Sequence, residues 1–172
     1  GVIAGTTKTP EEQKKAAQYF ERVRALKDNA KTTYADLPEL KELATLGLAR
    51  VHYGMGRYAS AVETYEQVPR FSTYWDDALF ENGWARFMND DPGGGLGSLE
   101  ALHAPQFAGS FQPESWILKA TIYHYACLYE EVNQTLARFD ELYKPMATKV
   151  QSLQKGDKDF TYYYRLLQGE EI

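Results

Sequence analysis

The sequence predicts an all-α fold, a solenoid of antiparallel helix pairs with flanking helices. Small residues recur at Ala49, Gly83 and Ala120, each inside an apolar segment of helical period, at intervals of 34 and 37 residues. Each is followed by the same order of features, namely apolar or aromatic residues, a turn signal and a second apolar stripe. No alternation of apolar and polar residues is long enough to indicate a strand. A helix pair repeated at this period indicates a solenoid, because one pair cannot bury its apolar face alone.

The composition is that of one ordinary globular domain over residues 1–172, or of one section of a longer solenoid. The net charge of −5 argues against a nucleic-acid surface, because phosphate binding needs clustered Lys and Arg, and these are scattered here among acidic residues. No apolar run approaches the roughly 18 residues of a membrane span. We expect the chain to be a mature or excised fragment of a longer one. Its lone cysteine, Cys127, near the end of an apolar helical segment, predicts a packed thiol.

The N-terminal helix is expected within residues 9–35. Thr9 can cap it, Pro10 suits its first position and Glu12 can complete a capping box. Apolar residues then follow at helical spacing: Ala16, Tyr19, Phe20, Val23 and Leu26.

The first repeat is expected over residues 36–70. Asp36-Leu37-Pro38-Glu39 starts its first helix, Gly54-Met55-Gly56 ends that helix, and Pro69 closes the return helix.

The second repeat is expected over residues 74–103, and its turn carries a run of glycines. Asp90-Asp91-Pro92 followed by Gly93-Gly94-Gly95 predicts a plain turn, after which a short return helix carries three leucines. The glycine run is not interpreted as a phosphate loop, because no strand precedes it and no Gly-Lys-Ser/Thr follows.

The third repeat is expected over residues 113–145, after a loop at residues 103–112. Pro113 opens its first helix, and Pro145 is expected to end its return helix. C-terminal helices are expected over residues 146–172, with a break near Gly156-Asp157.

The first and third units resemble tetratricopeptide repeats, and the resemblance covers roughly residues 10–145. The second unit is degenerate at its turn, and in the third Lys119 replaces the usual leucine. The matching positions are Leu48-Ala49, Tyr53, Gly56-Arg57-Tyr58, Ala61, Tyr65 and Pro69 in the first unit, and Trp116, Ala120, Tyr123, Tyr129, Val132, Leu136 and Pro145 in the third. The resemblance implies a right-handed α-solenoid, similar to bacterial scaffold proteins, in which the first helix of each pair lines a concave groove.

The groove implied by this resemblance is apolar and aromatic. Its residues, spaced by three and four so that each set shares one side of its helix, are expected to be Leu43, Leu46, Arg50 and Tyr53, then Asp77, Phe80, Trp84, Phe87 and Met88, then Glu114, Ile117, Thr121, His124 and Tyr125. An aromatic centre with a charged rim predicts a non-catalytic scaffold that binds a protein segment there. The alternatives are that these side chains pack against the adjacent repeat, or that loop 103–112 fills the groove.

Two further function classes stay open at this point. The chain can be a structural subunit of a bacterial envelope assembly that packs through its terminal helices, since residues 160–167 are apolar. It can also be a helical hydrolase using Glu81, Glu100 or His124, but no partner residue is evident, so we expect no enzyme. We expect no metal site or cofactor, because no histidine spacing supports one. A texture similar to bacterial envelope repeat proteins favours the periplasm, and the cytoplasm stays open.

Overall fold

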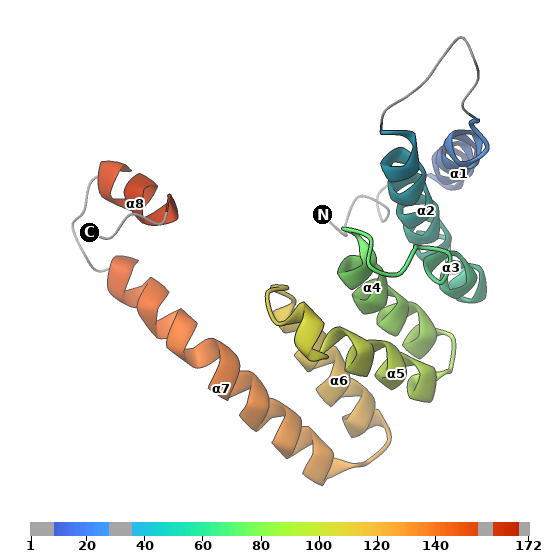
Figure 1. Ribbon diagram of the computed structural model, residues 1–172. Helices are drawn as coiled ribbons and strands as arrows, with labels where there is room; N and C mark the ends of the chain where they lie inside the picture. The colour runs from blue at the N-terminus through green and yellow to red at the C-terminus, as the bar shows by residue number, and fades with distance from the viewer. Residues whose placement is uncertain (1–8, 28–35, 155–159, 169–172) are drawn as a thin grey trace.

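The computed structural model describes residues 9–27, 36–154 and 160–168, and all regular secondary structure in these ranges is helical (Figure 1). This confirms the all-α prediction. The α-helices are α1 (Pro10–Arg24), α2 (Leu37–Gly54), α3 (Tyr58–Tyr65), α4 (Trp75–Met88), α5 (Pro92–Leu102), α6 (Pro113–Tyr125), α7 (Tyr129–Gln154) and α8 (Phe160–Leu167), with a 3₁₀ turn η2 (Pro105–Phe107) before α6.

Helices that are neighbours in sequence pack side by side from α1 to α7, and α4 also contacts α6 (Figure 1). The pairs α2–α3 and α4–α5 fall within residues 36–70 and 74–103, the pair α6–α7 begins at Pro113 and runs beyond residue 145, and α1 lies against α2. This arrangement sets the first helices of two successive units, α4 and α6, next to each other.

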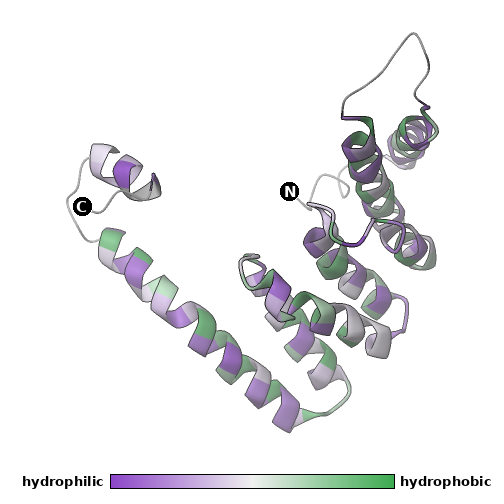
Figure 2. Cartoon of the chain, viewed as in Figure 1, coloured by the Kyte–Doolittle hydropathy of each residue, from purple (hydrophilic) through white to green (hydrophobic). Residues whose placement is uncertain are grey.

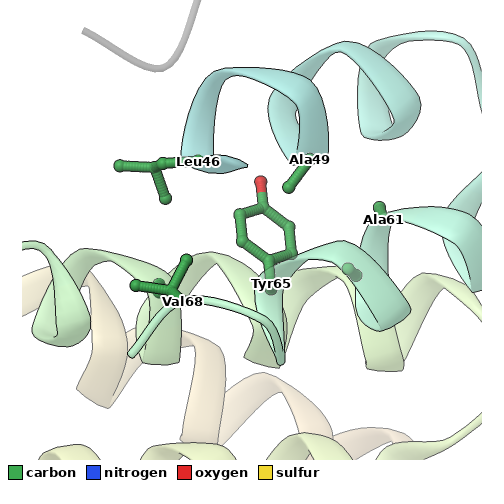
Figure 3. Close-up of a cluster of buried hydrophobic side chains, with 7 residues drawn as sticks. Leu46, Ala49, Ala61, Tyr65 and Val68 are labelled. Carbon is green, nitrogen blue, oxygen red and sulfur yellow. The ribbon is translucent and has the colours of Figure 1, made fainter. Parts of the chain in front are cut away.

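The three small residues point inward, as the sequence predicts. Ala49 is fully buried, Gly83 is buried and Ala120 is 7% exposed. Around Ala49, the ring of Tyr65 on α3 points towards α2 between Leu46 and Ala49 (Figure 3). Leu46 is only 1% exposed, so its expected place on an open groove is wrong. It faces the α2–α3–α4 core instead.

Helices α4 and α5 approach closely because two glycines face each other. A Cβ atom added to Gly83 would lie 3.2 Å from a methyl of Leu99, and one added to Gly95 would lie 3.1 Å from the carbonyl oxygen of Gly83. Leu99, together with Leu118 and Ile122 of α6, forms a second fully buried cluster. This cluster supports the α4–α6 face described below.

Helix α1 begins with the predicted capping box, in which Thr9 and Glu12 exchange hydrogen bonds. The helix ends at Arg24, and the rest of the expected 9–35 segment beyond residue 27 lies outside the described residues. None of the residues of α1 is fully buried. The ring of Phe20 packs against Gly47 of α2, where an added Cβ would lie 2.6 Å from the ring, and Gln13 Nε2 donates to the carbonyl of Gly54 at 3.4 Å.

The glycine run does not form the expected turn, because it lies in the first turn of α5. Asp91 caps this helix by accepting a hydrogen bond from the Gly94 amide at 2.9 Å, and Pro92 occupies the first position. A side chain on Gly94 would collide with the Asp91 carboxylate. The chain instead reverses direction between α4 and α5 at Asp90, the residue before the cap Asp91, and the φ of Asp90 is 58°.

Pro145 does not end its helix, because α7 continues through it to Gln154. The proline cannot donate to the carbonyl of Glu141, and it costs an interior helix about 3 kcal/mol. Glu141 is exposed, so water can satisfy that carbonyl. The apolar spacing also continues past the proline, as the alternation of colours along α7 shows (Figure 2).

Cys127 is exposed, so the expectation of a packed thiol is wrong. The regular part of α6 ends at Tyr125, and Cys127 takes the left-handed position of the turn before α7, with φ of 58°. Its amide donates to the carbonyl of His124 at 3.0 Å, while its side chain faces solvent.

Candidate functional site

Three aromatic rings form a row across α4 and α6. The ring centroids of Trp84 and Phe87 lie 6.4 Å apart, those of Phe87 and Tyr125 lie 5.6 Å apart, and both contacts are edge-to-face. Trp84 and Phe87 are half-buried because they pack on the Leu99–Leu118–Ile122 cluster. Tyr125 is 65% exposed at the open end of the row. The row is therefore anchored in the core and uncovered along one side. We call it the aromatic row.

The other expected groove residues of α4 and α6 flank this row. Phe80 is half-buried on the same cluster, whereas Met88 is 43% exposed and Ile117 is 45% exposed. Thr121 is exposed, and its hydroxyl donates to the carbonyl of Ile117 at 2.8 Å. The exposed ring of His124 contacts Tyr129 edge-on at 5.8 Å.

The expected charged rim includes an ion-pair network that joins α2 to α4. Arg50 donates from Nε and Nη2 to the carboxylate of Glu81, at 2.6 to 2.9 Å, and also approaches Asp77 at 3.6 Å. Glu81 is 5% exposed and accepts a further hydrogen bond from the hydroxyl of Tyr65 at 3.0 Å. The hydrogen bond to Glu81 raises the pKa of Arg50 even though partial burial opposes it. Burial, and then the Glu81 charge, raise the pKa of Tyr65.

This network means that Arg50 is not a free cation for a ligand. Its charge neutralises a buried carboxylate, which would otherwise be strongly disfavoured. Glu81 in turn is held by three donors, so it has the surroundings of a structural carboxylate and not those of a general acid. Glu100 also has a cationic partner, because Lys119 approaches it at 2.6 Å.

Two expected groove residues on α2 occupy different surroundings. Tyr53 is half-buried against the α2–α3–α4 core, and its ring contacts Tyr58 edge-on at 5.3 Å. Burial raises the pKa of Tyr53. Leu43 is 39% exposed. Glu114 on α6 is exposed.

Loop 103–112 contacts one end of this face instead of covering the aromatic row. Ser110 donates to Asp76 at 2.6 Å, and the Gln112 amide donates to Asp77 at 2.8 Å. The ring of Phe107 meets Trp75 edge-on at 5.1 Å. These contacts tie the loop to the first turn of α4.

A histidine–serine pair lies beside this loop. The hydroxyl of Ser115 donates to the carbonyl of Gln112 at 2.5 Å, so its oxygen accepts a hydrogen bond from His103 Nε2 at 2.8 Å. The His103 ring stacks on Trp116 with centroids 3.8 Å apart. Burial, and then the positive charge of Lys119, lower the pKa of His103 to about 4. Ser115 is 1% exposed, so the pair stabilises the start of α6 and does not present a nucleophile.

Sequence reasoning missed the buried role of Glu81 and the close packing at Gly47. A carboxylate on an apolar helix face, with an arginine on the preceding repeat, is a weak signal for the first. A glycine directly between Leu46 and Leu48 within a helical segment is a weak signal for the second. Neither signal identifies the partner residue without the structure.

Comparison with protein-family models, with curated proteins and with solved structures finds no match for this chain. None of the described helices is both long enough and apolar enough to cross a membrane. Across residues 9–27, 36–154 and 160–168, no three His, Cys, Asp or Glu side chains gather in a way that could hold a metal ion.

Proposed function

We propose that the chain is a non-catalytic scaffold that binds a protein segment on the α4–α6 face. The observation that supports this proposal is the aromatic row, which the core holds in place and which no described segment covers. Rigid aromatic rings with exposed apolar neighbours are typical of residues that dominate protein interfaces. The tetratricopeptide resemblance, with a right-handed solenoid and a concave groove, belongs to the same proposal.

The ligand is expected to be apolar at the aromatic row, because Arg50, the cation among the expected groove residues, is paired with Glu81, and Arg86 of α4 is paired with Glu66 and Asp91. Its side chains would contact Met88, Ile117 and Tyr125, the three most exposed apolar residues among those expected on this face. We keep the bacterial periplasm as the proposed compartment. The proposal is supported by the general similarity of the sequence to repeat proteins of bacterial envelopes.

The test is selection of binding peptides from a displayed random library, using the whole chain as bait. Dissociation constants of the selected peptides are then measured for Tyr125→Ala, Met88→Glu and the control Tyr19→Ala, whose ring on α1 is also about half exposed. We expect the first two variants to weaken binding about 30-fold, or about 2 kcal/mol, with no change in the control. Equal binding by all three variants, or a library that yields no binder, would contradict the proposal.

A second candidate, a structural subunit that packs through its terminal helices, is favoured by the exposed apolar side chains of α7. Leu136, Leu142, Met146 and Val150 are each between 39% and 48% exposed. Light scattering across a range of protein concentrations tests self-assembly directly. A mass that rises with concentration would favour this candidate over a monomeric scaffold.

A further inference from the structure

Helix α7 is twice as long as the helix on which it packs. α7 has 26 residues and α6 has 13, and a turn of three residues joins them. At 1.5 Å per residue, α7 reaches about 20 Å beyond the first residue of α6. Figure 1 shows this part of α7 running on past α6. We call residues 144–154 the α7 extension.

The apolar stripe of α7 continues along the extension. Tyr143, Met146, Val150 and Leu153 follow one another at spacings of three, four and three residues. Met146 is 47% exposed and Val150 is 48% exposed. This spacing is the seam by which one helix packs against another, since the knobs of one fit the holes of its partner.

A groove runs along this stripe where the extension passes the start of α6. It has a volume of about 360 Å³, and its wall is almost wholly apolar: Phe111, Pro113, Tyr143, Met146, Ala147, Val150 and Gln151. Phe111 is 65% exposed, and its ring meets Tyr143 edge-on at 5.9 Å. The groove therefore offers a second apolar wall opposite the helix.

The charge of the extension differs from that of the chain as a whole. Lys144 and Lys149 are its only charged residues, whereas the whole chain carries a net charge of −5. Both lysines are exposed, and neither forms an ion pair with another described residue. Lys149 lies at the edge of the stripe, where an acidic residue of a docked helix would lie, whereas Lys144 lies on the side of α7 turned away from it.

We propose that the α7 extension docks an amphipathic helix of a partner protein, with acidic residues beside its apolar seam. The stripe spacing and the groove select a helix, and the unpaired Lys149 selects acidic residues beside its seam. A second copy of this chain fits less well, because an antiparallel pairing of two extensions about their midpoint brings Lys149 near its own copy. This surface is independent of the aromatic row on α4 and α6.

The experiment uses two synthetic three-heptad peptides with the same leucine seam, one flanked by Glu and the other by Lys. Their binding to the intact chain is measured by fluorescence anisotropy. We expect the Glu peptide to bind at least about tenfold more tightly than the Lys peptide. Lys149→Glu should reverse this order, since only the sign of the flanking charge changes.

Two further variants separate this surface from others. Met146→Glu/Val150→Glu should abolish binding of the Glu peptide, and Tyr125→Ala should leave it unchanged. Circular dichroism checks that each variant stays folded. We expect the fold to survive, because the substituted side chains are exposed. Equal binding of the two peptides, binding of neither, or an unchanged order in the charge-reversed variant would overturn the proposal. A dimer in sedimentation that Met146→Glu/Val150→Glu dissociates would also overturn it, by making a second copy the occupant.

Discussion

Helices α2 and α7 carry apolar residues at the same helical spacing, yet they bury very different numbers of their residues. α2 buries six of its 18 residues, whereas Thr135 is the one fully buried residue among the 26 of α7. α2 lies between α1 and α3, but α7 packs along α6 only over its first half, and at its far end the hydroxyl of Tyr163 on α8 donates to the carbonyl of Leu153 at 2.7 Å. An apolar stripe thus shows that one face of a helix can pack against another helix. The length of the neighbouring helices decides how much of that face is buried.

The largest expected effect compares an apolar side chain in each region. Leu118→Ala should lower the free energy of unfolding by about 3 kcal/mol, because Leu118 is fully buried between α4, α5 and α6. Val150→Ala should lower it by less than about 0.5 kcal/mol, since Val150 is 48% exposed. Urea unfolding followed by circular dichroism measures both. Similar losses in the two variants would show that the extension is covered.

The second comparison concerns two ion pairs. Glu81→Gln should cost about 2 kcal/mol, because it leaves Arg50 without its buried carboxylate, although Arg50 can still reach water. Glu141→Gln on α7 should cost less than about 0.5 kcal/mol, because Glu141 and Arg138 are both more than half exposed. The same urea titration measures the two free energies. A neutral Glu81→Gln would contradict the structural role of this network.

The third comparison concerns two glycines at contacts between helices. Gly47→Ala should cost about 1 kcal/mol net of the helix propensity that alanine gains, since its methyl would lie 2.6 Å from the Phe20 ring and push the ring away. Gly83→Ala should be nearly neutral, because the contact with Leu99 at 3.2 Å needs only a small shift and alanine gains about 1 kcal/mol of helix propensity. Thermal unfolding of both variants tests this difference. The reverse order would mean that α4 and α5 tolerate less adjustment than α1 and α2.

A pH dependence of stability is expected from His103, whose ring is only half-buried. Its pKa of about 4 in the folded chain lies below the ordinary 6.5, so the unfolded chain takes up this proton first as the pH falls. The free energy of unfolding should therefore decrease between pH 6.5 and about 4, in addition to any contribution from carboxylates. In His103→Gln this part of the decrease should disappear, as urea midpoints across the same pH range will show. An identical pH profile in the two proteins would contradict the buried neutral histidine.

Local signals in the sequence predicted most of the helical framework. The capping box at Thr9, the turn around Gly56 and the inward small residues depend on near neighbours or on a fixed period, so they can be recognised in the chain alone. The glycine run led to the wrong prediction of a turn, because glycine is also required at Gly94, beside the cap Asp91, and at Gly95, where α5 packs closely on α4. Only the packing of α4 against α5 separates these uses.

The candidate site was less predictable than the fold. Helical spacing placed Trp84, Phe87 and Tyr125 on the expected sides of their helices, and the row that they form became visible with the contact between α4 and α6. The same spacing placed Leu46 on the groove, but the structure buries it beneath Tyr65. Spacing gives the side of a helix, whereas the tilt between helices decides which residue on that side reaches solvent.

Hydrogen exchange measured by mass spectrometry tests most directly whether the α7 extension is less protected by packing than the core helices. We predict slow exchange of the amides of α4, α5 and the buried part of α6, at the level of global unfolding, and fast exchange across residues 144–154 of α7. Protection of residues 144–154 equal to that around Leu118 would contradict the account, because it would show that the α7 extension already has a partner within the chain.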